Sequence, residues 1–254
     1  MISTGIVSVT FRKLSPEAIV SLAEQAGLDA IEWGGDVHVP PGDLALARQV
    51  RAMTENAGLK VSSYGSYFRV GAPADFQIVL DTAEALGAPN IRIWAGSVGS
   101  AEADDDMRDR IVVEIRRMAE LAQQKGIRLS LEFHDGTLAD TETSSVSLIR
   151  SIACDRVSLY WQPQIGAPQP SNLKTLTAFL PWLSNVHVFH YDMERRQQPL
   201  EAGESAWRSY IDALRTSDKP RFLMLEFVKD GESEQFLEDA RTLKKWIEFD
   251  RGVE

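Results

Sequence analysis

Four short stretches share one pattern and decide the fold class: Gly27-Leu-Asp-Ala-Ile, Gly58-Leu-Lys-Val-Ser, Gly87-Ala-Pro-Asn-Ile-Arg-Ile and Gly126-Ile-Arg-Leu-Ser-Leu. Each glycine follows an amphipathic helical pattern and precedes an apolar, strand-like run. Glycine directly after a helix is typical of a left-handed C-terminal cap. The glycines lie 31, 29 and 39 residues apart, which is the length of one strand, one helix and two short loops. The pattern therefore predicts a repeating strand and helix unit.

Working outward from these junctions, eight strand-like runs can be placed along the chain. They are Gly5–Phe11, Ala30–Gly34, Lys60–Ser66, Asn90–Gly96, Arg128–His134, Val157–Gln162, Asn185–Tyr191 and Arg221–Phe227. Helical patterns lie between them, for example after the capping residue Ser15 and over Leu46–Ala57, Asp106–Lys125 and Glu234–Phe249. We interpret Asp192–Ala206 as a long loop after the seventh strand, on the catalytic face.

Eight alternating units predict an α/β fold, the (β/α)8 TIM barrel, with residues 1–254 in a single domain. An open doubly wound sheet usually has fewer strands and a glycine-rich first turn. Neither GxGxxG nor GxxxxGK[ST] follows any predicted strand, so the sequence argues against a dinucleotide-binding fold and a P-loop.

Composition limits the partners. The chain has 27 Lys and Arg against 37 Asp and Glu, a net charge of -10, which repels nucleic acid backbones. Cys154 is the only cysteine, so an intramolecular disulfide and a cysteine-rich zinc site are excluded and a reducing compartment is favoured. The N-terminus lacks a basic signal-peptide region, and no apolar run approaches the roughly 18 residues of a membrane span. We expect a soluble, cytoplasmic protein that binds neither nucleic acid nor membranes.

Polar side chains gather at the predicted carboxyl ends of four consecutive strands, where a parallel barrel builds its active site. Glu132 and Glu226 lie in apolar runs on the fifth and eighth strands, Gln162 ends the sixth, and His187 lies in the seventh. A buried carboxylate needs a positive or hydrogen-bonding partner, and two facing carboxylates need a cation even more. Oxygen donors with one nitrogen suit Mg²⁺, Mn²⁺, Co²⁺ or Zn²⁺. The alternative is a hydrogen-bonded polar cluster that holds no metal.

Two histidines compete for the place on the seventh strand. Strand alternation puts His187 and His190 on opposite faces unless a bulge intervenes, and we favour His187 because it lies nearer the middle of its apolar run. His190 then either supports a metal ligand or contacts the substrate. His134 and His38 follow the fifth and second strands and are further candidates.

Aromatic rings near the strand ends can stack on the C–H surface of a polyol. Phe133, Trp161 and Phe227 neighbour Glu132, Gln162 and Glu226 in sequence, so we expect these three rings to face the helices. Four other rings then remain free to line the open carboxyl end of the barrel, which we call the mouth. They are Phe11, Trp33, Tyr64 and Trp94. Candidate partners for substrate oxygens or a phosphate are Arg69, Arg92, Arg195 and Arg196.

The chain resembles the xylose isomerase-like barrel family of sugar and sugar-phosphate isomerases and epimerases over nearly its full length. The resemblance rests on Gly27-Leu-Asp-Ala-Ile-Glu-Trp-Gly-Gly-Asp-Val-His-Val-Pro, Leu131-Glu132-Phe-His134, Leu180-Pro-Trp-Leu-Ser-Asn-Val-His187-Val, Pro199-Leu-Glu-Ala-Gly-Glu and Met224-Leu-Glu226-Phe. It implies a divalent metal held by Glu132, Gln162, His187 and Glu226. Gln162 departs from the pattern, because the family has an aspartate there, and a neutral ligand should weaken the site.

By this resemblance, Glu132 and Glu226 act as the acid and base on either side of a substrate carbon, while the metal polarises the neighbouring carbonyl. The implied function is a metal-dependent isomerase or epimerase of a keto sugar, sugar phosphate or polyol derivative, and a homo-oligomer is compatible with it. One alternative is dehydration or hydrolysis on the same barrel, although the acidic charge and only four histidines disfavour an endonuclease. Another is a sugar-binding barrel that has lost catalysis, which Gln162 suggests.

Overall fold

Eight parallel strands form a closed barrel in which β1 pairs with both β2 and β8. The structure is a computed structural model and describes residues 1–248. The strands are β1 (Ile2–Val7), β2 (Ala30–Gly34), β3 (Lys60–Arg69), β4 (Asn90–Trp94), β5 (Arg128–Glu132), β6 (Val157–Trp161), β7 (Leu183–Val188) and β8 (Arg221–Leu225). The predicted (β/α)8 fold class is confirmed.

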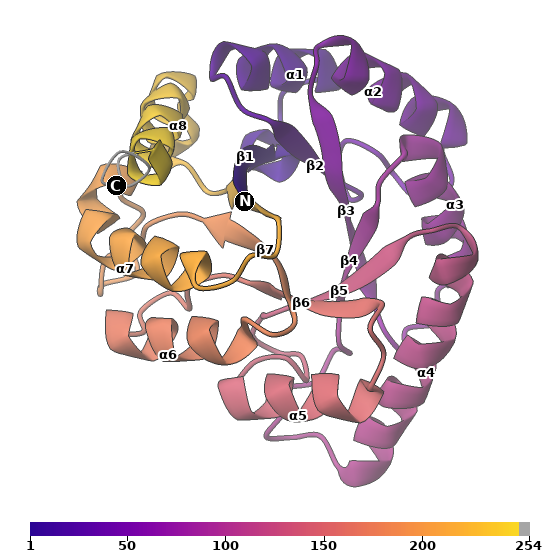
Figure 1. Ribbon diagram of the computed structural model, residues 1–254. Coiled ribbons are helices and arrows are strands. Elements are labelled where there is room, and N and C mark those ends of the chain that lie inside the picture. Colours follow the sequence, from indigo (N-terminus) through magenta and orange to yellow (C-terminus); the bar gives the residue numbers. More distant parts are fainter. Residues whose placement is uncertain (249–254) are drawn as a thin grey trace.

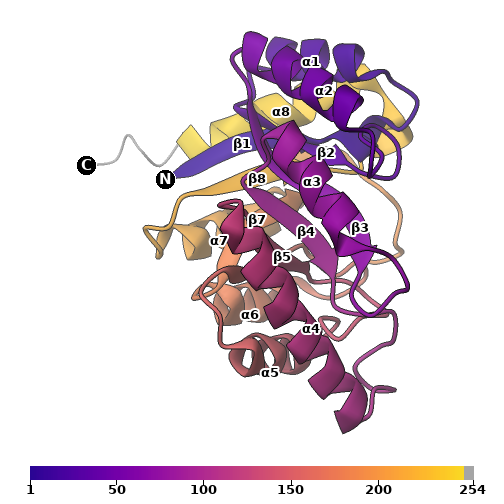
Figure 2. The same cartoon turned by 90° about the vertical axis from the view of Figure 1, so that its right-hand side faces the viewer.

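A helix follows each strand and covers the outside of the barrel, as the ring of helices in Figure 1 and the side view of α3 and α4 in Figure 2 show. The helices are α1 (Pro16–Gln25), α2 (Leu44–Asn56), α3 (Phe76–Leu86), α4 (Asp105–Gln124), α5 (Glu142–Ile152), α6 (Gln169–Phe179), α7 (Glu204–Arg215) and α8 (Ser233–Glu248). The predicted end of the last helix at Phe249 lies outside the described residues. Within residues 1–248, no helix is both long and apolar enough to cross a membrane.

The helix boundaries follow local chemistry. Ser15 accepts a hydrogen bond from the Ala18 backbone N–H at the start of α1, as its N-cap position predicts. The glycines of the four repeated junctions all have positive φ, and Gly87 is the left-handed cap of α3, with φ 72°. The sequence pattern that predicted the repeat therefore has the expected conformational cause.

Every predicted strand except Ala30–Gly34 has somewhat different bounds in the structure, and three of the differences are notable. β1 ends at Val7, and Ser8–Phe11 form a 3-10 helix instead of more strand. The Ser8 hydroxyl accepts a bond from the Gly34 N–H at 2.8 Å, which ties this segment to the end of β2. The loop after β7 is shorter than expected, because a 3-10 helix (Leu200–Gly203) and then α7 begin within it. β3 runs on to Arg69 through an irregular register.

The barrel axis is filled by a small core of its own, separate from the large core between strands and helices. It consists of Val7, Val9, Tyr160 and Met224, with Tyr67 and Phe222 packed against them. A Cβ on Gly5 would lie 2.6 Å from the Met224 Sδ, so the absence of a side chain at Gly5 makes room for Met224. This plug separates the two ends of the barrel.

Candidate active site

The four predicted metal ligands come together at the carboxyl end of the barrel. Glu132 is the last residue of β5, His187 lies in β7, and Gln162 and Glu226 directly follow β6 and β8. The His187 Nδ1 lies 3.1 Å from the Gln162 Oε1, 3.2 Å from the Glu226 Oε2 and 3.8 Å from the Glu132 Oε1. Three oxygens from three strands therefore surround one imidazole nitrogen.

The atom types of this donor set suit a divalent ion. Two of the three distances from the His187 Nδ1, those to Gln162 and Glu226, also suit a shared ion. Ligands about 2.1 Å from one ion lie about 3.0 to 3.4 Å apart at angles between square and tetrahedral. The Glu226 Oε2 is buried and has no hydrogen-bond partner in the described residues, despite its closeness to the His187 Nδ1. The Gln162 Nε2 donates to the Phe133 carbonyl at 3.0 Å, so the side-chain oxygen is the atom turned toward His187.

The Glu132 Oε1 stands farther off than a shared ion requires. Accordingly, residues 1–248 contain no complete preformed group of three His, Cys, Asp or Glu side chains for a metal. The set becomes a four-ligand site only with the Gln162 oxygen and with the Glu132 carboxylate turned further toward His187.

A buried arginine connects this cluster to a third carboxylate. Arg92 in β4 donates from Nε to the Glu32 Oε1 at 2.7 Å and from Nη1 to the Glu132 Oε2. Glu32, at the centre of β2, also accepts bonds from the Ser63 hydroxyl at 2.8 Å and the Tyr160 hydroxyl at 2.5 Å. Arg92 is 2% exposed and Glu32 is fully buried. Because Arg92 bridges both acids, it offsets part of their buried negative charge.

Two neighbours hold this arginine network in place. A Cβ on Gly65 would lie 2.7 Å from the Arg92 Nη2 and 2.9 Å from the Glu32 Oε1, so only glycine leaves room for the pair. The Trp94 indole N–H donates to the Glu132 Oε2, the oxygen that Arg92 also binds. Glu132 is therefore anchored through Oε2, while its Oε1 faces His187.

The network sets the acidities of its members. Burial raises the pKa of Glu226, and the nearby carboxylates Glu132 and Glu32 raise it further against the opposing effects of His187 and Arg92. Burial also acts to raise the pKa of Glu32, but Arg92, His187 and the Tyr160 hydroxyl outweigh it and hold that pKa well below its ordinary range. Burial lowers the pKa of His187, yet Glu226 and Glu32 raise it more. Glu226 therefore holds a proton more readily than an ordinary carboxyl does.

Trp94 and His134 lie at the edge of this mouth. Their ring centroids are 4.9 Å apart, and the Arg69 guanidinium carbon lies 3.9 Å above the Trp94 ring. The Tyr67 ring meets Trp94 edge to face at 5.4 Å. Tyr67 was not among the predicted site residues, because neither strand alternation nor a motif marks it.

Three other predicted substrate contacts do not reach the mouth. Trp33 is fully buried and donates to the Thr54 hydroxyl on α2 at 3.2 Å. Tyr64 is also fully buried, and its hydroxyl donates to the Val39 carbonyl at 2.7 Å. The His38 ring lies between the Ser8 hydroxyl at 3.0 Å and the Leu14 carbonyl at 3.2 Å.

Alternation explains why the expected lining by Trp33 and Tyr64 is wrong. Glu32 faces the axis, so its neighbour Trp33 must face the helices. The same rule correctly places Phe133 and Trp161, which pack on Phe179 and Tyr210 at centroid distances of 5.2 Å.

Two other rings differ from the prediction, since Phe11 was expected to line the mouth and Phe227 to face the helices. Phe11 packs edge to face on Phe236 of α8, and Phe227 is 41% exposed with a positive φ of 54°.

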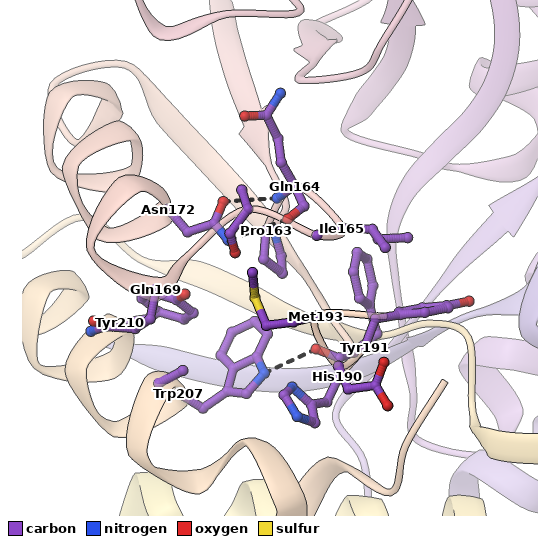
Figure 3. Close-up of a pocket in the computed structure, with 15 residues that line it drawn as sticks. Pro163, Gln164, Ile165, Gln169, Asn172, His190, Tyr191, Met193, Trp207 and Tyr210 are labelled. Carbon is purple, nitrogen blue, oxygen red and sulfur yellow. Dashed lines mark hydrogen bonds between the residues drawn. The ribbon is translucent and has the colours of Figure 1, made fainter. Parts of the chain in front are cut away.

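His190 lines a separate cavity of about 290 Å³ beside the mouth. Figure 3 shows Met193, from the loop after β7, between the Trp207 ring and Pro163 of the loop after β6, with the side chain of Gln164 turned away from this space. Tyr191 and Tyr210 also line the cavity. The Trp207 indole donates to the Phe189 carbonyl at 3.0 Å, which ties α7 to this loop. Burial lowers the pKa of His190, so its ring is neutral at physiological pH.

Two predicted cationic contacts lie outside the mouth. Arg196 is 64% exposed and pairs with Asp192 at 2.9 Å and Glu194 at 2.8 Å within its own loop. Arg195 donates from Nη1 to the Ile165 carbonyl at 2.9 Å and braces the two loops against each other.

Glu32 is the important residue that the sequence argument missed. It stands inside the apolar run Ala30–Gly34, and the same signal identified Glu132 and Glu226. Tyr160 and Ser63, its hydrogen-bond donors, carry no such signal.

Comparison with known proteins places this chain in a family. A family model described as "Xylose isomerase-like TIM barrel" matches residues 20–246. A 3-dehydroshikimate dehydratase from Bacillus anthracis is 24% identical over 202 residues, covering 72% of this chain and 70% of that protein. The crystal structure of a probable 3-DHS dehydratase from Bacillus anthracis is similar with a TM-score of 0.79 at 20% identity, covering 95% of this chain and 98% of that one.

Two further solved structures are similar over nearly their whole length. A D-allulose 3-epimerase from Methylomonas sp. has a TM-score of 0.74 at 17% identity, covering 96% and 97% of the two chains. A xylose isomerase-like protein from Mycobacterium smegmatis, in complex with magnesium, has a TM-score of 0.73 at 17% identity, covering 96% of each. Divalent metals are common in this group of proteins. The chain belongs to the xylose isomerase-like TIM barrel family of enzymes.

Proposed function

We propose that this enzyme is a divalent-metal-dependent isomerase or epimerase of a keto sugar, sugar phosphate or polyol derivative. The observation that carries the proposal is the approach of the Glu132 Oε1 and the Glu226 Oε2 to the same nitrogen of His187. Two carboxylates on separate strands at one mouth can reach a substrate carbon from different sides. The sugar epimerase and the magnesium complex among similar structures support this reaction class.

Each carboxylate has a distinct part in the proposed proton transfer. Glu226, whose buried Oε2 has no hydrogen-bond partner among residues 1–248, takes the proton from the carbon next to the substrate carbonyl. The C–H electron pair forms a carbon–carbon double bond to the carbonyl carbon, and the carbonyl oxygen takes the negative charge of an enediolate. Glu132, anchored through Oε2 by Arg92 and Trp94, gives a proton from its Oε1 to the other face or to the neighbouring carbon. It regains a proton from solvent, and Glu226 releases to solvent the proton that it took.

Glu132, Gln162, His187 and Glu226 would hold the ion. When bound, a divalent ion polarises the substrate carbonyl and so acidifies the adjacent C–H. The side chains at the edge of the mouth, Trp94 and His134, are proposed to contact the substrate, and His190 in the adjoining cavity is proposed to contact its distal end.

Solvent deuterium exchange tests the proposal. Wild type with Mn²⁺ and a panel of ketoses should incorporate deuterium from D₂O at one carbon, and Glu226→Gln and Glu132→Gln should each lower turnover on the order of 10²- to 10⁴-fold. Glu194→Gln is a matched control, because it removes an exposed carboxylate of the loop after β7. Unchanged turnover in both site variants would rule out the mechanism.

Dehydration is the second candidate. The Glu132 Oε2 already accepts bonds from both Arg92 and Trp94, which leaves Glu226 as the freer base. An elimination needs only one such group, because the proton that it takes from carbon can be given to the departing hydroxyl, which leaves as water. The Bacillus anthracis dehydratase supports this alternative. Loss of water with growth of ultraviolet absorbance from a new conjugated double bond distinguishes it from epimerisation, which yields an isomer of equal mass.

A further inference from the structure

A second large cavity opens at the opposite end of the barrel from the catalytic cluster. It has a volume of about 1040 Å³ and lies among the amino-terminal ends of the strands. Lys60, Asn90, Arg128 and Arg221 begin β3, β4, β5 and β8 and line it. Met224, which fills the axis, lies between this cavity and the mouth. The cavity is therefore a separate site, which we call the basal cavity.

The basal cavity is cationic although the protein is acidic overall. Its lining has one acidic residue, Asp155, and five cationic ones, which are Lys60, Arg128, Arg150, Lys219 and Arg221. The whole chain, in contrast, has a net charge of -10. The rim cations bind neutral groups: Arg128 donates to the Asp155 backbone carbonyl and Lys219 to the Pro181 carbonyl. No ion pair joins any of the five to a carboxylate of residues 1–248.

Arg221 is the most buried of these charges. It is 2% exposed, and its guanidinium donates to the Lys219 carbonyl at 3.3 Å and to the Ser217 hydroxyl at 2.9 Å. Its Nη1 has no partner among the described residues, and neither has the Nδ2 of Asn90 in the same lining. Burial alone lowers the pKa of Arg221, whereas two carboxylates raise that of Arg92. A buried cation without a counter-charge is stabilised by an anion.

The lining also offers an apolar wall. Trp182 and Phe222 are partly buried there, and the Arg150 guanidinium carbon lies 5.6 Å from the Trp182 ring centroid. Partly exposed rings beside cations suit a ligand with an apolar body and a charged end.

We propose that the basal cavity binds a small organic oxyanion, with its phosphate or carboxylate group toward Arg221 and the rim cations and its apolar body against Trp182 and Phe222. The site is independent of the proposed catalysis at the other end of the barrel.

Calorimetric titration with phenyl phosphate tests this proposal. Phenol and inorganic phosphate are titrated separately, because they represent the apolar body and the charged group of that ligand. We expect phenyl phosphate to bind more tightly than either half. The double variant Arg128→Gln/Lys219→Gln removes two exposed rim charges and should weaken binding about tenfold. The matched control Arg48→Gln/Arg110→Gln removes two exposed charges from α2 and α4 outside the cavity, and should change binding less than about twofold.

Further variants distinguish binding in the basal cavity from binding at the catalytic mouth. Arg221→Gln should abolish binding, and the rim variant decides the question if Arg221→Gln fails to fold. Glu226→Gln at the catalytic mouth should bind phenyl phosphate as wild type does. Benzoate, titrated in parallel, distinguishes a carboxylate from a phosphate preference. Equal weakening in the two double variants, loss of binding in Glu226→Gln, or no binding to wild type would each overturn the proposal.

Discussion

Arg92 is the residue on which the charge balance of the mouth depends, because it bridges Glu32 and Glu132 in a buried position. We predict that Arg92→Met lowers the free energy of unfolding by about 3 to 5 kcal/mol, since it leaves both acids buried without their cation. Urea denaturation measures the effect. Arg117→Met, which removes an exposed arginine paired with Glu114, should change stability by less than about 1 kcal/mol. A similarly small loss in Arg92→Met would show that the two acids need no internal cation.

His38 is predicted to make the fold sensitive to acid. Burial lowers its pKa in the folded protein, so the unfolded chain binds more protons and stability falls as pH drops through the unfolded pKa of about 6.5. Between about pH 7.5 and pH 5.5, wild type should lose more thermal stability than His38→Gln. The change in melting temperature over this range, compared between the two proteins, removes any constant offset caused by the substitution. Equal pH slopes would contradict the prediction, and an NMR titration of the His38 ring gives the pKa directly.

At the scale of elements, β3 must carry glycine where it passes the arginine network. We predict that Gly65→Ala destabilises the protein by about 1 to 3 kcal/mol, because its methyl group would overlap the Arg92 Nη2 and the Glu32 Oε1. In an Arg92→Met background the same substitution should be less destabilising, since one of the overlapping groups is gone. A double-mutant cycle from denaturation curves measures this coupling. Additive effects would place the strain elsewhere in β3.

Strand alternation explains which parts of the site could be predicted. Glu132, Gln162, His187 and Glu226 are polar residues at the carboxyl ends of apolar runs, so sequence alone could bring them to one mouth. The same rule, applied to Glu32, would have supplied the second acid of the arginine network and turned Trp33 outward.

The partners within the site could not be predicted in this way. Tyr160 meets Glu32 across 128 positions of sequence, and Arg92 meets it across 60. Such pairs depend on strand register and on which side chains fill the barrel axis, and a single sequence pattern fixes neither. The same limit applies at the end of β1. There Ser8–Phe11 form a 3-10 helix, and the Ser8 hydroxyl accepts a hydrogen bond from the Gly34 N–H.

For the molecule as a whole, metal binding should raise the free energy of unfolding of the entire barrel, because the barrel is one closed sheet. The proposed ligands come from four neighbouring strands of one closed sheet, so an ion bound only by the folded state stabilises the entire barrel. At a concentration about 100 times the dissociation constant, Mn²⁺ should add about 2.7 kcal/mol, which is about 5 to 10 °C in melting temperature for a domain of this size. Glu226→Gln should lose most of this gain, whereas Glu194→Gln, in an exposed loop position, should keep it.

Gln162→Asp gives the sharpest form of this prediction, because the added carboxylate has opposite effects with and without the ion. In metal-free protein it places another acid beside Glu132 and Glu226, so the melting temperature should fall. With Mn²⁺ it supplies a charged ligand where wild type has a neutral oxygen, so the ion-dependent rise should exceed that of wild type. Scanning calorimetry of both proteins in chelator and in Mn²⁺ measures the two effects. An ion-dependent rise no larger in Gln162→Asp than in wild type would mean that this position does not face the ion, and that the metal, if it binds, is held elsewhere on the barrel.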